Sequence, residues 1–223
     1  MGRLDDAGRL RGLGHHAVAL CGCGHLARGG VRSVRIVARV ARDMAMHSTP
    51  TRAEMLALLQ RLQAPVALVQ HHRLVLEAAD GVCDALAEAQ VPFDRPFVEA
   101  GAALHDAGKI LFPQEIHGSG SAHETAGEAF LVAHGVDPGL ARCCRTHAAW
   151  RGPEVGFEER LVALADTLWK GVRRPELEES VIAEAALRAG ADRWALYITL
   201  DDAFERVAAA GPDRLARRRV TGS

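Results

Sequence analysis

Aromatic residues are scarce in this chain: they make up 4% of its 223 residues, and only one of them is a tyrosine. Net charge is also nearly absent, with 27 basic residues against 28 acidic ones. The balanced charge excludes a global field that attracts nucleic acid or an anionic membrane, and no basic groove with interleaved aromatic residues indicates a nucleic-acid-binding surface. The remaining composition, rich in Ala, Leu, Val, Arg and Glu, favours helices over strands and predicts an all-α protein.

Long apolar runs are missing as well, since none approaches the roughly 20 residues that a membrane-spanning helix needs. The five cysteines are an odd number without framework spacing, which is typical of a reducing compartment. We therefore expect a soluble, cytoplasmic protein without a membrane partner. The cluster at residues 21–25 resembles half of a zinc site only weakly, because no second Cys/His pair at zinc-finger spacing follows it.

The N-terminal part of the chain differs from the rest. Residues 1–46 hold eight arginines against three aspartates, no lysine, and eight of the chain's 22 glycines. Two interpretations are open: an arm for targeting or for nucleic acid, or a disordered extension with Met44 or Met46 as the working start. We favour the extension. The predicted division is an extension at 1–47, one helical domain at 48–211 and a basic, solvated tail at 212–223.

Hydrophobic periodicity and capping signals predict helices throughout the domain. Their approximate ranges are 52–64, 65–90 with a break at Gly81, 95–107, 122–134, 138–147, 158–170, 175–189 and 192–210. Two capping boxes, at residues 51–54 and 121–124, are predicted to open the first and the fourth of these helices. Between the third and the fourth, residues 110–116 should be extended or turning, and 117–120 should form a flexible loop.

The strongest functional signal is His105-Asp106-Ala107-Gly108-Lys109. It ends an almost wholly apolar helix that should be buried, and Gly108 stops that helix. An unpaired charge buried at a helix end costs on the order of several kcal/mol. His105 and Asp106 must therefore be paired with other groups or bind a metal ion.

Four residues carry a resemblance to a known family. They are His71, His105, Asp106 and Asp166. In this order they match the His…His-Asp…Asp pattern of the HD superfamily of metal-dependent phosphohydrolases, an all-α fold that residues 50–172 resemble. The segment 104–116 also looks like the His-Asp-x-Gly-Lys-Ile…Pro…Ile stretch of the HD-GYP subgroup, although the Gly-Tyr-Pro of that subgroup is absent. The predicted domain is therefore a single HD-domain helical bundle.

The resemblance implies a dinuclear metal site. It places His71, His105 and Asp166 on one ion, His123 and His147 on the other, and Asp106 between them as a bridge. Such ligands suit Mn, Fe, Co, Ni or Zn, and a metal-activated hydroxide is the implied nucleophile. The residues by themselves leave another interpretation open. His71 can be a satisfied core histidine, His123 a first-turn residue and His147 a cation at a helix C-terminus.

Three cationic side chains are predicted to contact a substrate phosphate. They are Lys109, Lys170 and Arg145. Lys109 is assigned to catalysis together with Asp106, and its alternative is an exposed surface lysine. Lys170 follows Asp166 at i+4, so it is either a phosphate contact or the ion partner of Asp166. Arg145 is expected at the rim of a pocket lined by the loops 110–120 and 148–157.

These residues predict a phosphohydrolase that acts on a small phosphorylated compound, either a phosphomonoester or a phosphodiester, with nucleotides among the candidate substrates. Two alternatives stay open. Some relatives with a six-ligand site hold two iron ions and activate oxygen, and a metal-stabilised helical scaffold can bind a partner without catalysis. The Gly-Lys pair after Asp106 favours phosphate. The sequence predicts neither the oligomeric state nor the choice of metal.

Overall fold

The computed structural model describes residues 49–220, with side chains up to residue 218. The predicted N-terminal extension and the Cys/His cluster at 21–25 lie outside the described residues. Helices and short 3₁₀ turns form all the regular structure between residues 49 and 220, and no strand is present there, which confirms the all-α prediction. None of these helices is long and apolar enough to span a membrane.

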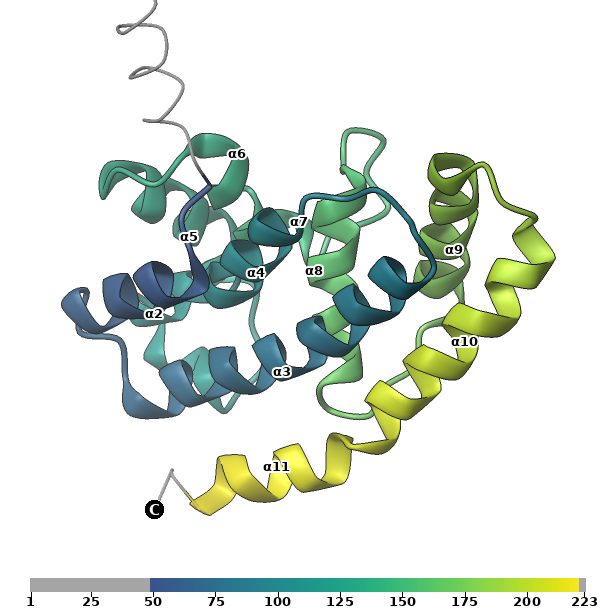
Figure 1. Ribbon diagram of the computed structural model, residues 1–223. Coiled ribbons are helices and arrows are strands. Elements are labelled where there is room, and N and C mark those ends of the chain that lie inside the picture. Colours follow the sequence, from purple (N-terminus) through teal and green to yellow (C-terminus); the bar gives the residue numbers. More distant parts are fainter. Residues whose placement is uncertain (1–48, 221–223) are drawn as a thin grey trace, which may run out of the picture. The chain divides into compact units, whose positions relative to one another are not determined.

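The elements agree closely in order with the predicted helices. Their bounds are α2 Arg52–Arg61, α3 Val66–Glu88, α4 Arg95–Leu104, η1 Ala107–Ile110, η2 Pro113–Ile116, α5 Ala122–Ala133, α6 Pro138–Ala141, α7 Cys143–Thr146, α8 Phe157–Leu168, α9 Pro175–Ala189, α10 Arg193–Ala209 and α11 Gly211–Val220. The long helix α3 packs against α4, α8 and α10, and α10 continues into α11, which also contacts α3 (Figure 1).

The hydrophobic core lies between α3, α4 and α8. Aliphatic side chains that are fully buried there include Leu74, Val75, Val82, Leu104, Leu161 and Leu164. Each such side chain stabilises the fold by roughly 1.5–3 kcal/mol relative to exposure. The packed core therefore determines where the early turns of α3, the C-terminal end of α4 and the last turn of α8 meet.

Two predicted helix features differ from the structure. No break occurs at Gly81, because α3 is continuous and Gly81 packs against α10, where a Cβ would lie 2.6 Å from Cγ2 of Val207. The predicted helix at 138–147 is two short helices, α6 and α7, which meet at Arg142. The capping box of α2 is confirmed, since the backbone N–H of Thr51 donates to Glu54 Oε2 at 2.7 Å.

A helix, α11, occupies the region where a solvated basic tail is predicted. Arg214 is buried and donates to the carbonyl oxygen of Val207 at 2.8 Å, and Arg217 pairs with Glu77 of α3 at 2.5 Å. A Cβ on Gly211 would collide with the backbone of Gly171. The missing side chain lets α11 begin directly against the turn after α8. These contacts hold α11 against the domain.

Candidate metal centre

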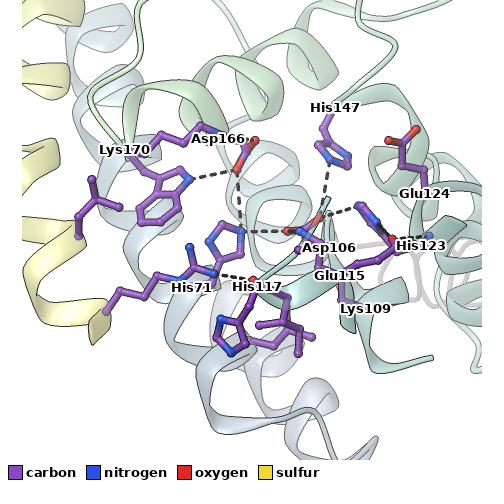
Figure 2. A pocket seen from close by; sticks show the side chains of 16 residues that line it. His71, Asp106, Lys109, Glu115, His117, His123, Glu124, His147, Asp166 and Lys170 are labelled. Atoms are coloured by element: carbon purple, nitrogen blue, oxygen red, sulfur yellow. Dashed lines mark hydrogen bonds and ion pairs between the residues drawn. The ribbon is translucent and has the colours of Figure 1, made fainter. Parts of the chain in front are cut away.

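A pocket of about 640 Å³ opens beside the core. Five of the six predicted metal ligands line it: His71, Asp106, His123, His147 and Asp166. The sixth, His105, is completely buried and contacts the others, with its Nε2 3.4 Å from Oδ1 of Asp166. Figure 2 shows Asp106 between His71 on one side and His123 and His147 on the other. The structure thus brings all six residues together, although they come from five separate parts of the chain.

Four residues form what we call the first donor group: His71, His105, Asp106 and Asp166. Nε2 of His71 lies 3.1 Å from Oδ2 of Asp106 and 3.3 Å from Nε2 of His105. Oδ1 of Asp166 lies 3.8 Å from the same Nε2 of His71. Ligand atoms at about 2.0–2.2 Å from one ion lie roughly 3–3.6 Å from each other. The spacing of His71, His105 and Asp106 therefore fits a single divalent transition-metal ion, and Asp166 lies next to them, with its Oδ1 3.4 Å from Nε2 of His105.

The second donor group consists of Asp106, His123 and His147. Oδ1 of Asp106 lies 3.1 Å from Nε2 of His123 and 3.7 Å from Nε2 of His147. Asp106 thus presents one oxygen to each group. Both Oδ1 of Asp106 and Nε2 of His123 are buried without a hydrogen-bond partner. Since buried polar atoms are normally paired, two such atoms that face one another fit a shared cation.

Hydrogen bonds orient three of the four histidine rings. Nδ1 of His105 donates to the carbonyl oxygen of Ala102 at 3.0 Å, and Nδ1 of His147 donates to that of Cys143 at 3.0 Å. Nδ1 of His123 donates to the Glu115 carboxylate at 2.5 Å. A ring that donates through Nδ1 keeps the lone pair of its Nε2 for a metal ion. In each case this Nε2 points toward an aspartate of the donor groups.

The charge states of Asp106, Asp166 and His147 suit metal binding. Burial raises the pKa of the Asp106 carboxyl, but the neighbouring His105, His123 and His71 outweigh this effect and hold that pKa well below its usual value. The pKa of Asp166 is likewise lowered, because the hydrogen bond and charge of His105 outweigh burial. Burial lowers the pKa of His147 to about 4. At neutral pH both carboxylates are ionised and His147 is neutral, as metal ligands must be.

Gly108 explains how the two donor groups come so close. A Cβ at this position would overlap the carbonyl oxygen of His123 and lie 2.8 Å from Cα of Gly127. Only glycine lets the η1 turn and α5 approach at this distance. The glycine two residues after Asp106 therefore allows His123 to lie beside the Asp106 carboxylate.

Glu115 is a site residue that the sequence analysis missed. Its carboxylate accepts from the backbone N–H of His123 at 3.2 Å and from the ring of the same residue. It therefore caps α5 in place of Ser121, whose side chain makes no capping bond, and the predicted second capping box is wrong. Glu124, predicted to close that box, lines the pocket instead.

Both lysines of the chain lie at this site. Among 27 basic residues only Lys109 and Lys170 are lysines, and both line the pocket. Nζ of Lys109 is 2.5 Å from Oδ2 of Asp106, and Nζ of Lys170 is 3.7 Å from Oδ2 of Asp166. Each ammonium group is thus held next to a carboxylate of the first donor group.

The structure does not bring Arg145 to the pocket. Its guanidinium pairs with Glu128 of α5 at 2.9 Å, because α7 directs this side chain toward α5. The predicted loop at 148–157 does not line the pocket either. Two residues of α11, Leu215 and Arg218, belong to the lining instead.

The family model described as the HD domain matches residues 68–185, more than half of the chain. The matched range contains both donor groups. This chain belongs to the HD domain family. No curated protein and no solved structure matches it. The HD domain is typical of a superfamily of metal-dependent phosphohydrolases, and HD domains bind divalent metal ions. The two His/Asp clusters of this chain are compatible with metal binding.

Proposed function

We propose that this HD domain hydrolyses the phosphate ester of a small molecule, a monoester or a diester, with two divalent metal ions. The observation that carries the proposal is the position of Asp106, which offers one oxygen to each donor group at the base of a pocket. A pocket of about 640 Å³ suits a small molecule of nucleotide size rather than a polymer.

The first donor group would hold one ion and the second donor group the other. Imidazole and carboxylate ligands suit Mn, Fe, Co, Ni or Zn. Two such ions, when bound, supply a hydroxide nucleophile at neutral pH and neutralise charge on the phosphate oxygens. Burial of the ligands and the hydrogen bonds at Nδ1 of three histidines keep the binding atoms in place before any ion arrives.

Lys109 and Lys170 support a phosphorylated substrate. Both ammonium groups are compact positive charges at the wall of the pocket, which is how lysine binds phosphate. Their contacts with Asp106 and Asp166 hold them within reach of a phosphate that lies against the donor groups. In this position they attract the ester and stabilise the negative charge that its phosphate carries.

The same two lysines favour hydrolysis over oxygen activation by two iron ions. An oxygenase would use similar ligands, but it has no general need for two cationic side chains against the metal ligands. The complete set of six ligands, five of them at the pocket and His105 buried in contact with them, also favours catalysis over a binding scaffold without activity.

Phosphate release tests the proposal. The full chain is freed of metal, supplied separately with Mn, Co, Ni, Fe or Zn, and assayed on a panel of phosphomonoesters and phosphodiesters. We expect release with at least one ion, and no loss in Arg145→Ala, whose side chain lies outside the pocket. Metal-loaded protein that releases no phosphate but consumes oxygen with iron would overturn the proposal in favour of the oxygenase.

A further inference from the structure

We propose that α11 forms a second substrate subsite, in which Arg218 binds an anionic group on the leaving-group side of the phosphate ester. The inference rests on the proposed function and adds a substrate class to it. That class is a phosphate ester whose leaving group has an apolar body and carries its own carboxylate or phosphate.

The position of Arg218 separates it from the two lysines. The lysines lie against the carboxylates of the first donor group, whereas Nη2 of Arg218 donates to the carbonyl oxygen of Ile116 at 2.8 Å. The Trp169 ring lies between these regions: its centroid is 4.9 Å from that of His71 and 5.5 Å from the Arg218 guanidinium. A ligand that bridges the donor groups and Arg218 must therefore reach past this ring.

Apolar side chains form part of the lining of the same pocket. Leu215 lies one helical turn before Arg218 on α11, and Leu68 of α3 and Ile116 of η2 add further apolar surface. Ligand pockets commonly combine an apolar lining with a few polar groups that orient the ligand. The lining of this pocket thus matches a molecule with a phosphate at one end, an apolar middle and an anion at the other end.

Arg218 is positioned by the packing of its helix. The close approach of Gly211 to Gly171 places the start of α11, and Arg217 pairs with Glu77 of α3. A guanidinium carries five N–H donors in a planar fork, so Arg218 can bind an anionic ligand while it keeps its bond to Ile116 and its place over the Trp169 ring. Because the helix is already in place, a bound anion would cost little ordering of the side chain.

The helix that carries Arg218 lies outside the part of the chain that the HD family model matches. The HD match ends at residue 185, whereas α11 begins at Gly211. HD residues thus build the donor groups, and a later helix builds the far wall. We infer that α11 selects the substrate while the HD residues carry out the reaction.

A matched pair of probes tests the subsite. One probe is 4-carboxyphenyl phosphate and the other is its uncharged counterpart, 4-carbamoylphenyl phosphate. Homologues with one and two methylenes before the carboxylate or amide vary the distance to Arg218. Phosphate release gives kcat/KM for both members of each pair, and calorimetry with the metal-loaded chain gives Kd. The variants are Arg218→Ala and Arg218→Gln, which keeps a donor for Ile116.

We define the preference as kcat/KM for the carboxylate probe divided by kcat/KM for the matching amide probe. For at least one spacing, this ratio should be roughly tenfold higher in the wild type than in either variant, because one charge-assisted hydrogen bond has about this effect. Arg206→Ala, which removes an exposed arginine of α10 outside the pocket, should keep the wild-type preference. Metal content and thermal melting should match the wild type in all variants.

The outcomes separate the subsite from the proposed function. Hydrolysis of both probes with the same preference in wild type and Arg218→Gln would overturn the subsite and leave the hydrolase intact. Binding that depends on Arg218 without hydrolysis would support the subsite and count against the hydrolase. Probes that neither bind nor react at any spacing would overturn the subsite as drawn.

Discussion

The two donor groups share Asp106 but are built from different kinds of structure. His71 and Asp166 of the first donor group lie on α3 and α8, and His105 caps α4, so all three are placed by the helices that form the hydrophobic core. In the second donor group, His123 lies in the first turn of α5, and His147 ends the four-residue helix α7.

This difference indicates what holds each group in place. Core packing fixes the first donor group, since the helices cannot shift without disrupting many buried side chains. The second donor group depends instead on individual hydrogen bonds, such as that from His123 to Glu115, and on the close contact at Gly108. We therefore expect the ion of the second donor group to be bound more weakly.

The largest effect should follow from the residue that both groups share. Asp106→Asn keeps the shape of the side chain but removes the charge that bridges the groups, so both ions should be lost. Loss of a residue that only hydrogen-bonds to a metal ligand lowers activity by up to roughly 100-fold. Loss of the shared ligand itself should lower the rate of phosphate release by more than that. Metal analysis by plasma mass spectrometry and the phosphate assay check this expectation. A variant that keeps one full equivalent of metal would show that Asp106 does not bridge.

A change in the second donor group alone should have a partial effect. His123→Ala should lose about one equivalent of metal and keep the other, because the first donor group is unchanged. His134→Ala is the matched control, since His134 is an exposed histidine at the other end of α5. If the two variants hold the same amount of metal, His123 is not a ligand.

Glu115 acts on the second donor group without reaching an ion itself. Glu115→Gln keeps an oxygen that can accept from the His123 ring but removes the negative charge, so the ring becomes a weaker ligand. We expect the affinity for the second ion to fall roughly 10–100-fold, with the first ion unaffected. Competition with a coloured chelator measures both affinities. Equal weakening of the two ions would instead indicate a general loss of structure.

The two lysines should affect the substrate more than the metal. Lys109→Ala should raise KM or lower kcat on phosphate esters by roughly tenfold, the effect of one charge-assisted hydrogen bond, with metal content unchanged. Because the chain has only two lysines, reductive ¹³C-methylation gives two lysine signals, both from the pocket. Phosphate added to metal-loaded protein should shift both; signals that do not move would indicate surface lysines.

Local patterns explain which parts of this account follow from the sequence. The residues of the first donor group end or interrupt apolar helices, so each has a local signal, and their order along the chain matches one family. Arg145 shows the limit of this reasoning: it is two residues from His147, yet its side chain points toward Glu128 of α5. Closeness in the sequence does not determine the direction of a side chain on a short helix.

Other features depend on contacts between distant segments, for which the sequence has no local signal. Glu115 reaches His123 only because two 3₁₀ turns fold back over the start of α5. The docking of α11 depends on the contact of Gly211 with Gly171 and on the pair formed by Arg217 with Glu77, 140 positions away. A run of arginines at a chain end looks like a solvated tail until these partners are known.

The central claim is that two unequal donor groups meet at Asp106. Calorimetric titration of the metal-free chain with Mn, Co or Zn tests it most directly, because one experiment gives both stoichiometry and affinity. We predict two binding events per chain, with the tighter one kept and the weaker one lost in His123→Ala. A single event that His123→Ala leaves unchanged, or no binding at all, would contradict the account.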